Sequence, residues 1–183
     1  MDSESILEVR GLKTYFFTRM GVVKAVDDVS LTLNRGESLG IAGESGCGKT
    51  TLAYSIIRLV PPPGRIVDGK IIFDGQDITA MSEEELRRNI RWSRISMIFQ
   101  GAMNALTPVY TIGQQIEEAI LCHRKASREE ARKKVADLLS MVGIDPERAE
   151  SYPHELSGGM KQRAMIAMAL ALEPDVVLSL IHI

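Results

Sequence analysis

The residues with the clearest chemical potential form a glycine-rich stretch, GESGCGKT, at positions 43–50. The stretch fits the pattern G-x-x-x-x-G-K-[ST], in which glycines let the backbone curl and point its N–H groups at phosphate oxygens. In this pattern Lys49 reaches the β- and γ-phosphates of a nucleotide, and the Thr50 hydroxyl binds Mg²⁺. The residues predicted to bind the nucleotide here are Gly43, Glu44, Ser45, Gly46, Cys47, Gly48, Lys49, Thr50 and Thr51.

A second glycine-rich stretch, LSGG, precedes a long apolar helical pattern that extends to Leu172. The N–H groups at the start of that helix would form a second anion-binding site on the same chain. One nucleotide cannot easily contact both sites within one subunit, so we expect a head-to-tail dimer in which Ser157 and Gly159 face the γ-phosphate held by the other subunit. Core packing explains the alanines and methionines of the helix, but not the Ser-Gly-Gly sequence. The residues assigned to this second site are Leu156, Ser157, Gly158, Gly159, Met160, Lys161 and Gln162.

The segments around the first loop should position it. Alternation of apolar and polar residues predicts strands at 6–17 and 22–33. A short apolar strand at 38–42 is predicted to run into the loop, and a helix is predicted from Lys49 to about Val60, where a proline run stops it. A strand before the glycines and a helix after them are the setting that this motif requires, which argues against a chance glycine turn.

The second half of the chain is predicted to be mainly helical. A strand at 70–73 enters a hairpin turn, and a further strand is predicted at 95–99. Helical patterns then dominate at 111–123 and 127–142, and the second of these opens with the capping-box sequence SREE. Residues from about 101 to 156 are therefore expected to form a helical insertion in an α/β domain.

Composition limits the classes of protein that fit. The chain has 183 residues, 45% apolar and 25% charged, with a formal net charge of -2, which suits a soluble globular domain and argues against a nucleic-acid partner. Cys47 and Cys122 have no metal or disulfide spacing, and the first ten residues lack the apolar stretch of a signal peptide. The longest apolar run, 164–172, is too short to cross a membrane.

The order of these motifs resembles that of the ATP-binding subunits of ABC transporters. GESGCGKT resembles the Walker A loop, Gln100 the Q-loop glutamine, and LSGGMKQR the signature motif. The stretches FQGAMNALTPVYTIGQQI and YPHELSGGMKQRAMIAMALALEPD are most similar to importer ATPases for oligopeptides, dipeptides and nickel. This resemblance implies an α/β P-loop NTPase fold with an N-terminal antiparallel β subdomain, a partial RecA-like core and a helical subdomain, all in one incomplete domain over 1–183.

The resemblance also implies roles for single residues and for partners. Phe16 would stack on the adenine of ATP, with Tyr15 and Phe17 as competitors, and Gln100 would contact Mg²⁺ and the attacking water. The expected partners are a second ABC ATPase subunit (identical or different), transmembrane permease subunits and, indirectly, an extracytoplasmic solute-binding protein. The protein would then lie peripherally on the cytoplasmic face of the cell membrane.

The end of the sequence departs from the family pattern. After a run like EPDVV the family has two apolar or small residues and then Asp-Glu-Pro, but here the acidic positions fall on Leu180 and Ile181. Neither side chain can hold Mg²⁺ through a water or polarise a hydrolytic water, so we expect ATP binding without hydrolysis. Residues 178–183, LSLIHI, resemble the translation of a transposon-end adapter used in sequencing libraries, and we interpret them as a non-native tail on a chain cut inside its Walker B strand. Evolved loss of catalysis is the alternative.

These observations leave three functional hypotheses. The leading one is an ATP-binding subunit that powers import of peptides, or of nickel or a related solute, through a separate channel. A soluble ABC ATPase that acts on DNA or ribosomes is a second, although no long coiled-coil or zinc insertion lies between Gln100 and Leu156. The third is a nucleotide-binding module without turnover.

Overall fold

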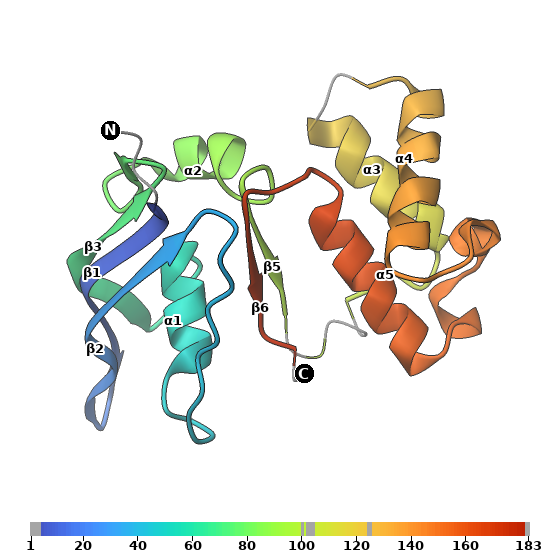
Figure 1. The fold of residues 1–183 in the computed structure, drawn as a ribbon. Helices are drawn as coiled ribbons and strands as arrows, with labels where there is room; N and C mark the ends of the chain where they lie inside the picture. The colour runs from blue at the N-terminus through green and yellow to red at the C-terminus, as the bar shows by residue number, and fades with distance from the viewer. Residues whose placement is uncertain (1–4, 100, 102–104, 124–125, 182–183) are drawn as a thin grey trace. The chain divides into compact units, whose positions relative to one another are not determined.

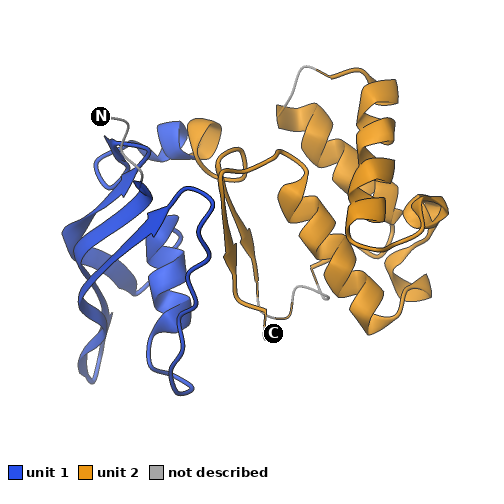
Figure 2. Ribbon diagram, viewed as in Figure 1, with its two compact units in different colours: residues 1–86 blue, residues 87–183 orange. Residues whose placement is uncertain are grey.

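A computed structural model describes residues 5–99, 101, 105–123 and 126–181. The chain forms two compact units, Met1–Leu86 and Arg87–Ile183, and Figure 2 colours them separately. The first unit contains the predicted phosphate loop, and the second contains the predicted signature helix. Gln100 lies outside the described residues, so the expectation for the Q-loop glutamine is not tested by the fold.

The first unit is built on a four-stranded antiparallel sheet (Figure 1). Its order is β2-β1-β3-β4, so the long hairpin of β1 and β2 continues across β1 into β3. The bounds are β1 Ser5–Thr18, β2 Gly21–Asn34, β3 Gly64–Phe73 and β4 Gln76–Asp77. The strands predicted at 6–17, 22–33 and 70–73 are confirmed, and the last of them begins earlier, at Gly64. Apolar residues of β1 and β3 supply most of the buried face of the sheet, whereas in β2 only Val26 is buried.

Helix α1 (Lys49–Ile56) packs on β1 of this sheet. A hydrogen bond of 2.8 Å joins the hydroxyls of Thr14 on β1 and Ser55 on α1, and both residues are fully buried. The helix ends earlier than the prediction of about Val60, because Arg58 turns into a positive φ of 53°. The proline run therefore does not mark the helix end itself, which comes several residues before it.

The strand predicted at 38–42 is wrong. No strand is assigned to these residues, and within the part of the chain that the structure describes they have no backbone ladder partner. Leu39 and Ile41 remain 47% and 49% exposed. An apolar run becomes a strand only when a neighbouring strand satisfies its N–H and C=O groups, and local composition does not supply that neighbour.

The second unit contains a two-stranded parallel sheet and a group of helices (Figure 1). Its strands are β5 Ile95–Ile98 and β6 Val176–Ser179, and its helices include α3 Ile112–His123, α4 Arg128–Met141 and α5 Gly158–Leu170. Helix α2 (Glu83–Asn89) spans the boundary between the units, and the short helices η2 (Pro146–Glu150) and η3 (Pro153–Glu155) precede α5. The predicted strand at 95–99 and helices at 111–123 and 127–142 are confirmed within one or two residues at each end.

The helices of the second unit share one apolar core. Small alanines of α5 pack against larger residues of α3 and α4, which lets the helices approach closely. The buried members of this core are Leu106, Ile112, Ile116, Ala119, Ile120, Ala131, Val135, Leu138, Leu139, Ile144, Leu156, Ala164, Ala167 and Ala171. The inner face of α5 is therefore core packing, as the alanines of its sequence indicated.

Local sequence also fixes where α4 begins and ends. Ser127 caps the first turn by accepting from the Glu130 N–H at 3.2 Å, and the Glu130 carboxylate accepts from the Ser127 N–H at 2.7 Å. The pKa of the Glu130 carboxyl is lowered because the carboxylate accepts hydrogen bonds from the Ser127 N–H and from the Ser127 hydroxyl. Gly143 follows the helix at a φ of 70°, a conformation that glycine adopts without steric cost.

Candidate nucleotide-binding site

The predicted phosphate loop has a backbone that depends on glycine. Gly46 and Gly48 have φ values of 81° and 98°, in the region that L-residues with a Cβ avoid. Gly48 also lies against β2, since a Cβ at this position would be 2.2 Å from the carbonyl oxygen of Ala25. Between them, the Cys47 N–H donates to the Glu44 carbonyl at 3.3 Å and closes a turn. The loop is thus curled, exposed and fixed against the sheet.

Lys49 places its ammonium group across this loop. Its Nζ donates to the carbonyl oxygens of Gly43 at 2.6 Å and Glu44 at 2.7 Å, and lies 3.5 Å from the Cys47 sulfur. These partners are uncharged, so they orient the ammonium without neutralising it. Lys49 is also the first residue of α1, where the helix adds a partial positive charge. The arrangement can bind an anion with several oxygens, such as the end of a polyphosphate.

Thr50 and Thr51 occupy the first turn of α1, and the helix holds this turn through a buried hydroxyl. Ser55 Oγ lies 2.7 Å from the Thr51 carbonyl and 2.8 Å from Thr14 Oγ1. A serine hydroxyl has one hydrogen, so Ser55 donates to Thr51 and accepts from Thr14. The bond from Thr14 therefore links β1 to the turn that carries the expected Mg²⁺ ligand, Thr50.

The structure distinguishes the three aromatic residues that compete for the adenine. The Tyr15 hydroxyl donates to Asp27 at 2.5 Å, and the Phe17 ring is covered by the guanidinium of Arg65 at 4.1 Å. Phe16 is half-buried on the opposite face of β1, the face on which Thr14 meets α1. Among the three, Phe16 is the residue on the same side of the sheet as the helix that follows the phosphate loop.

The Phe16 ring also borders a tight turn after α1. A Cβ at Gly64 would lie 2.7 Å from the ring and 2.7 Å from Val60, so glycine is required for this approach. The Phe17 N–H donates to the Pro63 carbonyl at 3.3 Å and fixes the strand at the same place. The ring is thus held at one edge and half-exposed elsewhere, which suits a stacking surface for a planar base.

The signature sequence forms the N-terminus of α5. Ser157 is the N-cap, with its Oγ accepting from the Met160 N–H at 3.3 Å and its carbonyl accepting from the Lys161 N–H at 2.9 Å. Ser157, Gly158 and Gly159 are all exposed, whereas Leu156 is buried. Nothing lies within 4 Å of the position that a Cβ of Gly159 would take. No contact among the described residues requires glycine there, which leaves room for close approach by another molecule.

The expected position of the acidic residues follows strand β6. β6 pairs with β5 in parallel register, and the Leu180 N–H donates to the Ile98 carbonyl at 2.8 Å just beyond the strand. Leu180 and Ile181 are therefore at the carboxyl end of the pair, where ligands of parallel sheets bind. Their side chains are aliphatic and can hold neither a metal nor a water.

The chemistry of the described residues suits Mg²⁺ held mainly by a nucleotide. In residues 5–99, 101, 105–123 and 126–181, no group of three or more His, Cys, Asp or Glu could hold a metal ion. Mg²⁺ characteristically keeps several waters and binds substrate phosphates with one or two protein ligands, rather than an all-protein cage. The exposed Thr50 hydroxyl, one residue after the phosphate-orienting lysine, fits that mode of binding.

Two contacts of these elements were not indicated by the sequence. The first is the approach of the Ala25 carbonyl to Gly48, which depends on the pairing of distant segments. The second is a hydrogen bond of 3.1 Å from Trp92 Nε1 to the Met168 carbonyl near the end of α5. The only sequence feature that could have drawn attention to the second contact is that the chain has a single tryptophan.

None of the described helices is long and apolar enough to cross a membrane.

Comparison with known protein families identifies the class to which this fold and these motifs belong. The sequence model described as ABC transporter matches residues 26–179. The chain therefore belongs to the ABC transporter family, as the order of its motifs indicated.

Relatives with assigned names narrow the similarity to peptide transport. The chain is 49% identical over 179 residues to the dipeptide transport ATP-binding protein DppD of Bacillus subtilis, covering 96% of this chain and 53% of that protein. It is 47% identical over 180 residues to a probable peptide ABC transporter ATP-binding protein, y4tR, of Sinorhizobium fredii, covering 97% of this chain and 53% of the relative. The chain thus spans about half the length of these relatives.

Solved structures show the same fold. A dimeric post-hydrolysis state of the ATP-binding cassette MJ0796, bound to ADP and Pi, matches with a TM-score of 0.83 and 28% identity, covering 94% of this chain and 72% of that one. A second dimeric structure of MJ0796, described as a bacterial ABC transporter cassette, matches with a TM-score of 0.82 and 30% identity, covering the same shares of the two chains. The expected α/β P-loop NTPase fold with an antiparallel β subdomain and helices is confirmed.

Proposed function

We propose that this chain is the ATP-binding part of an importer ATPase for peptides. The observation that carries the proposal is the phosphate loop, in which Lys49 crosses two carbonyl groups at the start of α1 and Gly48 is fixed against β2. The names of the similar proteins, which are peptide transport ATP-binding proteins, support the class of solute. Nickel or a related solute is the alternative cargo.

Each residue of the site has a task that follows from its chemistry. The loop N–H groups and Lys49 bind the β- and γ-phosphates of ATP, and the Thr50 hydroxyl binds Mg²⁺ that the nucleotide carries. Mg²⁺ neutralises phosphate charge when bound. Phe16 stacks on adenine from the face of β1 next to α1. Gln100, which lies outside the described residues, is proposed to contact Mg²⁺ and the attacking water.

A second subunit completes the site in this proposal. Ser157 and Gly159 contact the γ-phosphate bound by the partner subunit, because their N–H groups and the helix dipole favour a multiply charged anion. The exposure of both residues and the open space beside Gly159 support this arrangement. The similar MJ0796 structures are dimeric, which also supports it. The partner is either a second copy or a related ATP-binding subunit.

Hydrolysis is proposed to be absent from the chain with this sequence. Attack of water on the γ-phosphate needs a positioned nucleophile, and Leu180 and Ile181 supply no carboxylate at the end of β6. ATP is therefore bound and not consumed. In the transporter, the ATP-binding subunit is proposed to act at the cytoplasmic face of the membrane with permease subunits and, indirectly, with an extracytoplasmic solute-binding protein.

Binding of a fluorescent ATP analogue with Mg²⁺ tests the proposal. Lys49→Ala removes the only side-chain cation of the loop, so the dissociation constant should rise at least tenfold, or about 1.4 kcal/mol. Lys133→Ala, on the exposed side of α4, is the matched control and should bind like the parent chain. Equal affinity in the parent chain and in Lys49→Ala would contradict the assignment of the loop.

A further inference from the structure

The only tryptophan of the chain, Trp92, has an unusual backbone conformation. Its φ is 65°, a region that bulky aromatic residues rarely adopt and that persists only where the surroundings impose it. A tight turn imposes it here, since the Trp92 N–H donates to the Ile95 carbonyl at 2.8 Å. The N–H groups of Arg94 and Ile95 both donate to the Ile90 carbonyl at 2.9 Å. The turn directly precedes β5.

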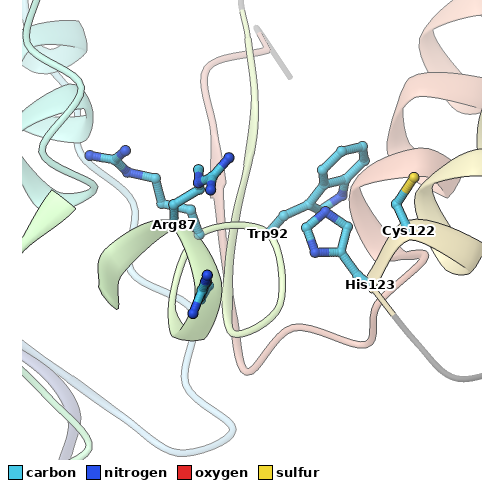
Figure 3. Close-up of a pocket in the computed structure, with 6 residues that line it drawn as sticks. Arg87, Trp92, Cys122 and His123 are labelled. Carbon is cyan, nitrogen blue, oxygen red and sulfur yellow. The ribbon is translucent and has the colours of Figure 1, made fainter. Parts of the chain in front are cut away.

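This turn directs the indole toward the helices. Trp92 Nε1 donates to the Met168 carbonyl at 3.1 Å, and the indole lies 5.7 Å from the His123 ring, at an angle of 59°. Figure 3 shows Trp92 and His123 side by side at the wall of a cavity of about 530 Å³. Trp92 is partly buried against the helical core, and the hydrogen bond is the contact that a phenylalanine could not make at this position.

The acceptor of this bond is at the end of the signature helix. Met168 is within the last four residues of α5, whose carbonyl groups have no regular partner inside the helix. The Met168 carbonyl also accepts from the Ala171 N–H at 3.2 Å, a shorter-range bond typical of a helix end. Trp92 therefore caps α5 from a different element and ties its C-terminal end to the start of β5.

We propose that Trp92 is a positioning residue for the signature sequence. Helix α5 has 13 residues and is therefore about 20 Å long, at about 1.5 Å per residue. A tilt of about 10° about its C-terminal end moves its N-terminal end by about 3 Å, which exceeds the tolerance of a hydrogen bond. By fixing the end at Met168, Trp92 keeps Ser157 and Gly159 at one orientation to β5. The inference rests on the proposed contact of these two residues with the partner's nucleotide.

The test compares nucleotide binding with ATP-driven dimerisation in the purified chain. Trp92→Phe keeps an aromatic ring and removes the donor, and His123→Ala removes the neighbouring ring from an exposed position. Tyr110→Phe, an exposed residue remote in sequence from both contacts, is the matched control. Affinity for a fluorescent ATP analogue reports on the phosphate loop, and sedimentation velocity with Mg-ATP reports on the dimer. Circular dichroism verifies that each variant is folded.

The expected result is a selective loss of dimerisation. Trp92→Phe should raise the dimer dissociation constant at least about fivefold, because in each subunit the signature helix is no longer fixed at Met168 and must be ordered when the dimer forms. Its nucleotide affinity should equal that of Tyr110→Phe. His123→Ala should raise the dimer dissociation constant about twofold. If Trp92→Phe does not fold, the dimerisation of His123→Ala tests the proposed role of Trp92 instead. A variant that was merely less stable would lose nucleotide affinity and dimerisation together, and not dimerisation alone.

The contrary outcomes separate this inference from the proposed function. A parent chain that binds no ATP analogue contradicts the proposed function itself. A parent chain that binds ATP without forming a dimer contradicts the contact between two copies of this chain, which is the arrangement that the inference assumes, and overturns the role of Trp92 with it. A parent chain that binds and dimerises, with folded Trp92→Phe and His123→Ala dimerising like Tyr110→Phe, overturns the role of Trp92 alone.

Discussion

Replacement of Gly48 by alanine should damage the phosphate loop far more than the same change at Gly46. Both residues have positive φ values, 98° and 81°, so a Cβ at either one costs about 1–2 kcal/mol of backbone strain. At Gly46 the Cβ would meet nothing within 4 Å, and strain is the whole cost. At Gly48 it would be 2.2 Å from the Ala25 carbonyl oxygen, so either the loop or strand β2 must shift.

The magnitude follows from what must move. Contacts below 3.0 Å do not persist at a Cβ, and the obstacle is main chain of a paired strand, which cannot rotate away like a side chain. We expect Gly48→Ala to destabilise the chain by about 3 kcal/mol or more and Gly46→Ala by about 1–2 kcal/mol. Where the variant stays folded, ATP affinity should also fall more for Gly48→Ala, because the displaced loop no longer presents its N–H groups together.

Urea denaturation followed by circular dichroism measures the stability of both variants, and titration with a fluorescent ATP analogue measures their affinity. The Gly46→Ala variant is the internal control for the strain that both changes share. Equal loss of stability in the two variants would refute the reasoning, since it would show that the contact between a Cβ at position 48 and the Ala25 carbonyl oxygen does not affect the free energy of unfolding. The same conclusion would follow from a Gly48→Ala chain that unfolds and binds like its parent.

Two further predictions concern the adenine and the helical core. Phe16→Ala should weaken ATP binding about fivefold, through loss of about 1 kcal/mol of stacking, while Phe17→Ala should leave it unchanged, as measured with the same analogue. Ser127→Ala should lower the thermal midpoint at pH 7, because the Glu130 carboxylate then loses its hydrogen bond from the Ser127 hydroxyl and the first turn of α4 loses its cap. The pKa of Glu130 is lowered in the fold, so its contribution is present above its unfolded pKa and disappears as pH falls through its folded pKa. The midpoints of the two chains should therefore approach each other in acid without becoming equal, because the cap from the Glu130 N–H to the Ser127 hydroxyl does not titrate. A difference that grows toward pH 3 would contradict this assignment.

Local sequence predicted most elements correctly, because their causes are local. The α4 helix has an S-x-x-E capping box, an apolar stripe and a terminal Gly143, and each contributes where the sequence places it. The β1–β2 hairpin likewise follows from alternation of apolar residues along 6–17 and 22–33. The curled loop at 43–50 was predicted from the spacing of its glycines and Lys49, and its binding of phosphate stays a prediction.

The remaining features depend on contacts between distant segments. The run at 38–42 is apolar enough for a strand, but no pattern within it states whether a neighbour will pair with it. The choice of Phe16 over Tyr15 depends on which face of β1 meets α1, and irregular pairing of β1 with β2 between Thr14 and Tyr15 obscures that face in the sequence. Trp92 is bonded to a residue 76 positions away, which no periodicity can reveal.

The hydrogen bond between Thr14 and Ser55 has a consequence for ligand length. Phe16 follows Thr14 by two positions on β1, and Ser55 donates to the Thr51 carbonyl in the first turn of α1. The surface proposed for the base and the turn proposed for the phosphates are therefore joined by one buried bond and cannot slide past each other. A nucleotide bound as proposed would therefore meet its base surface and its phosphate turn at a constant separation.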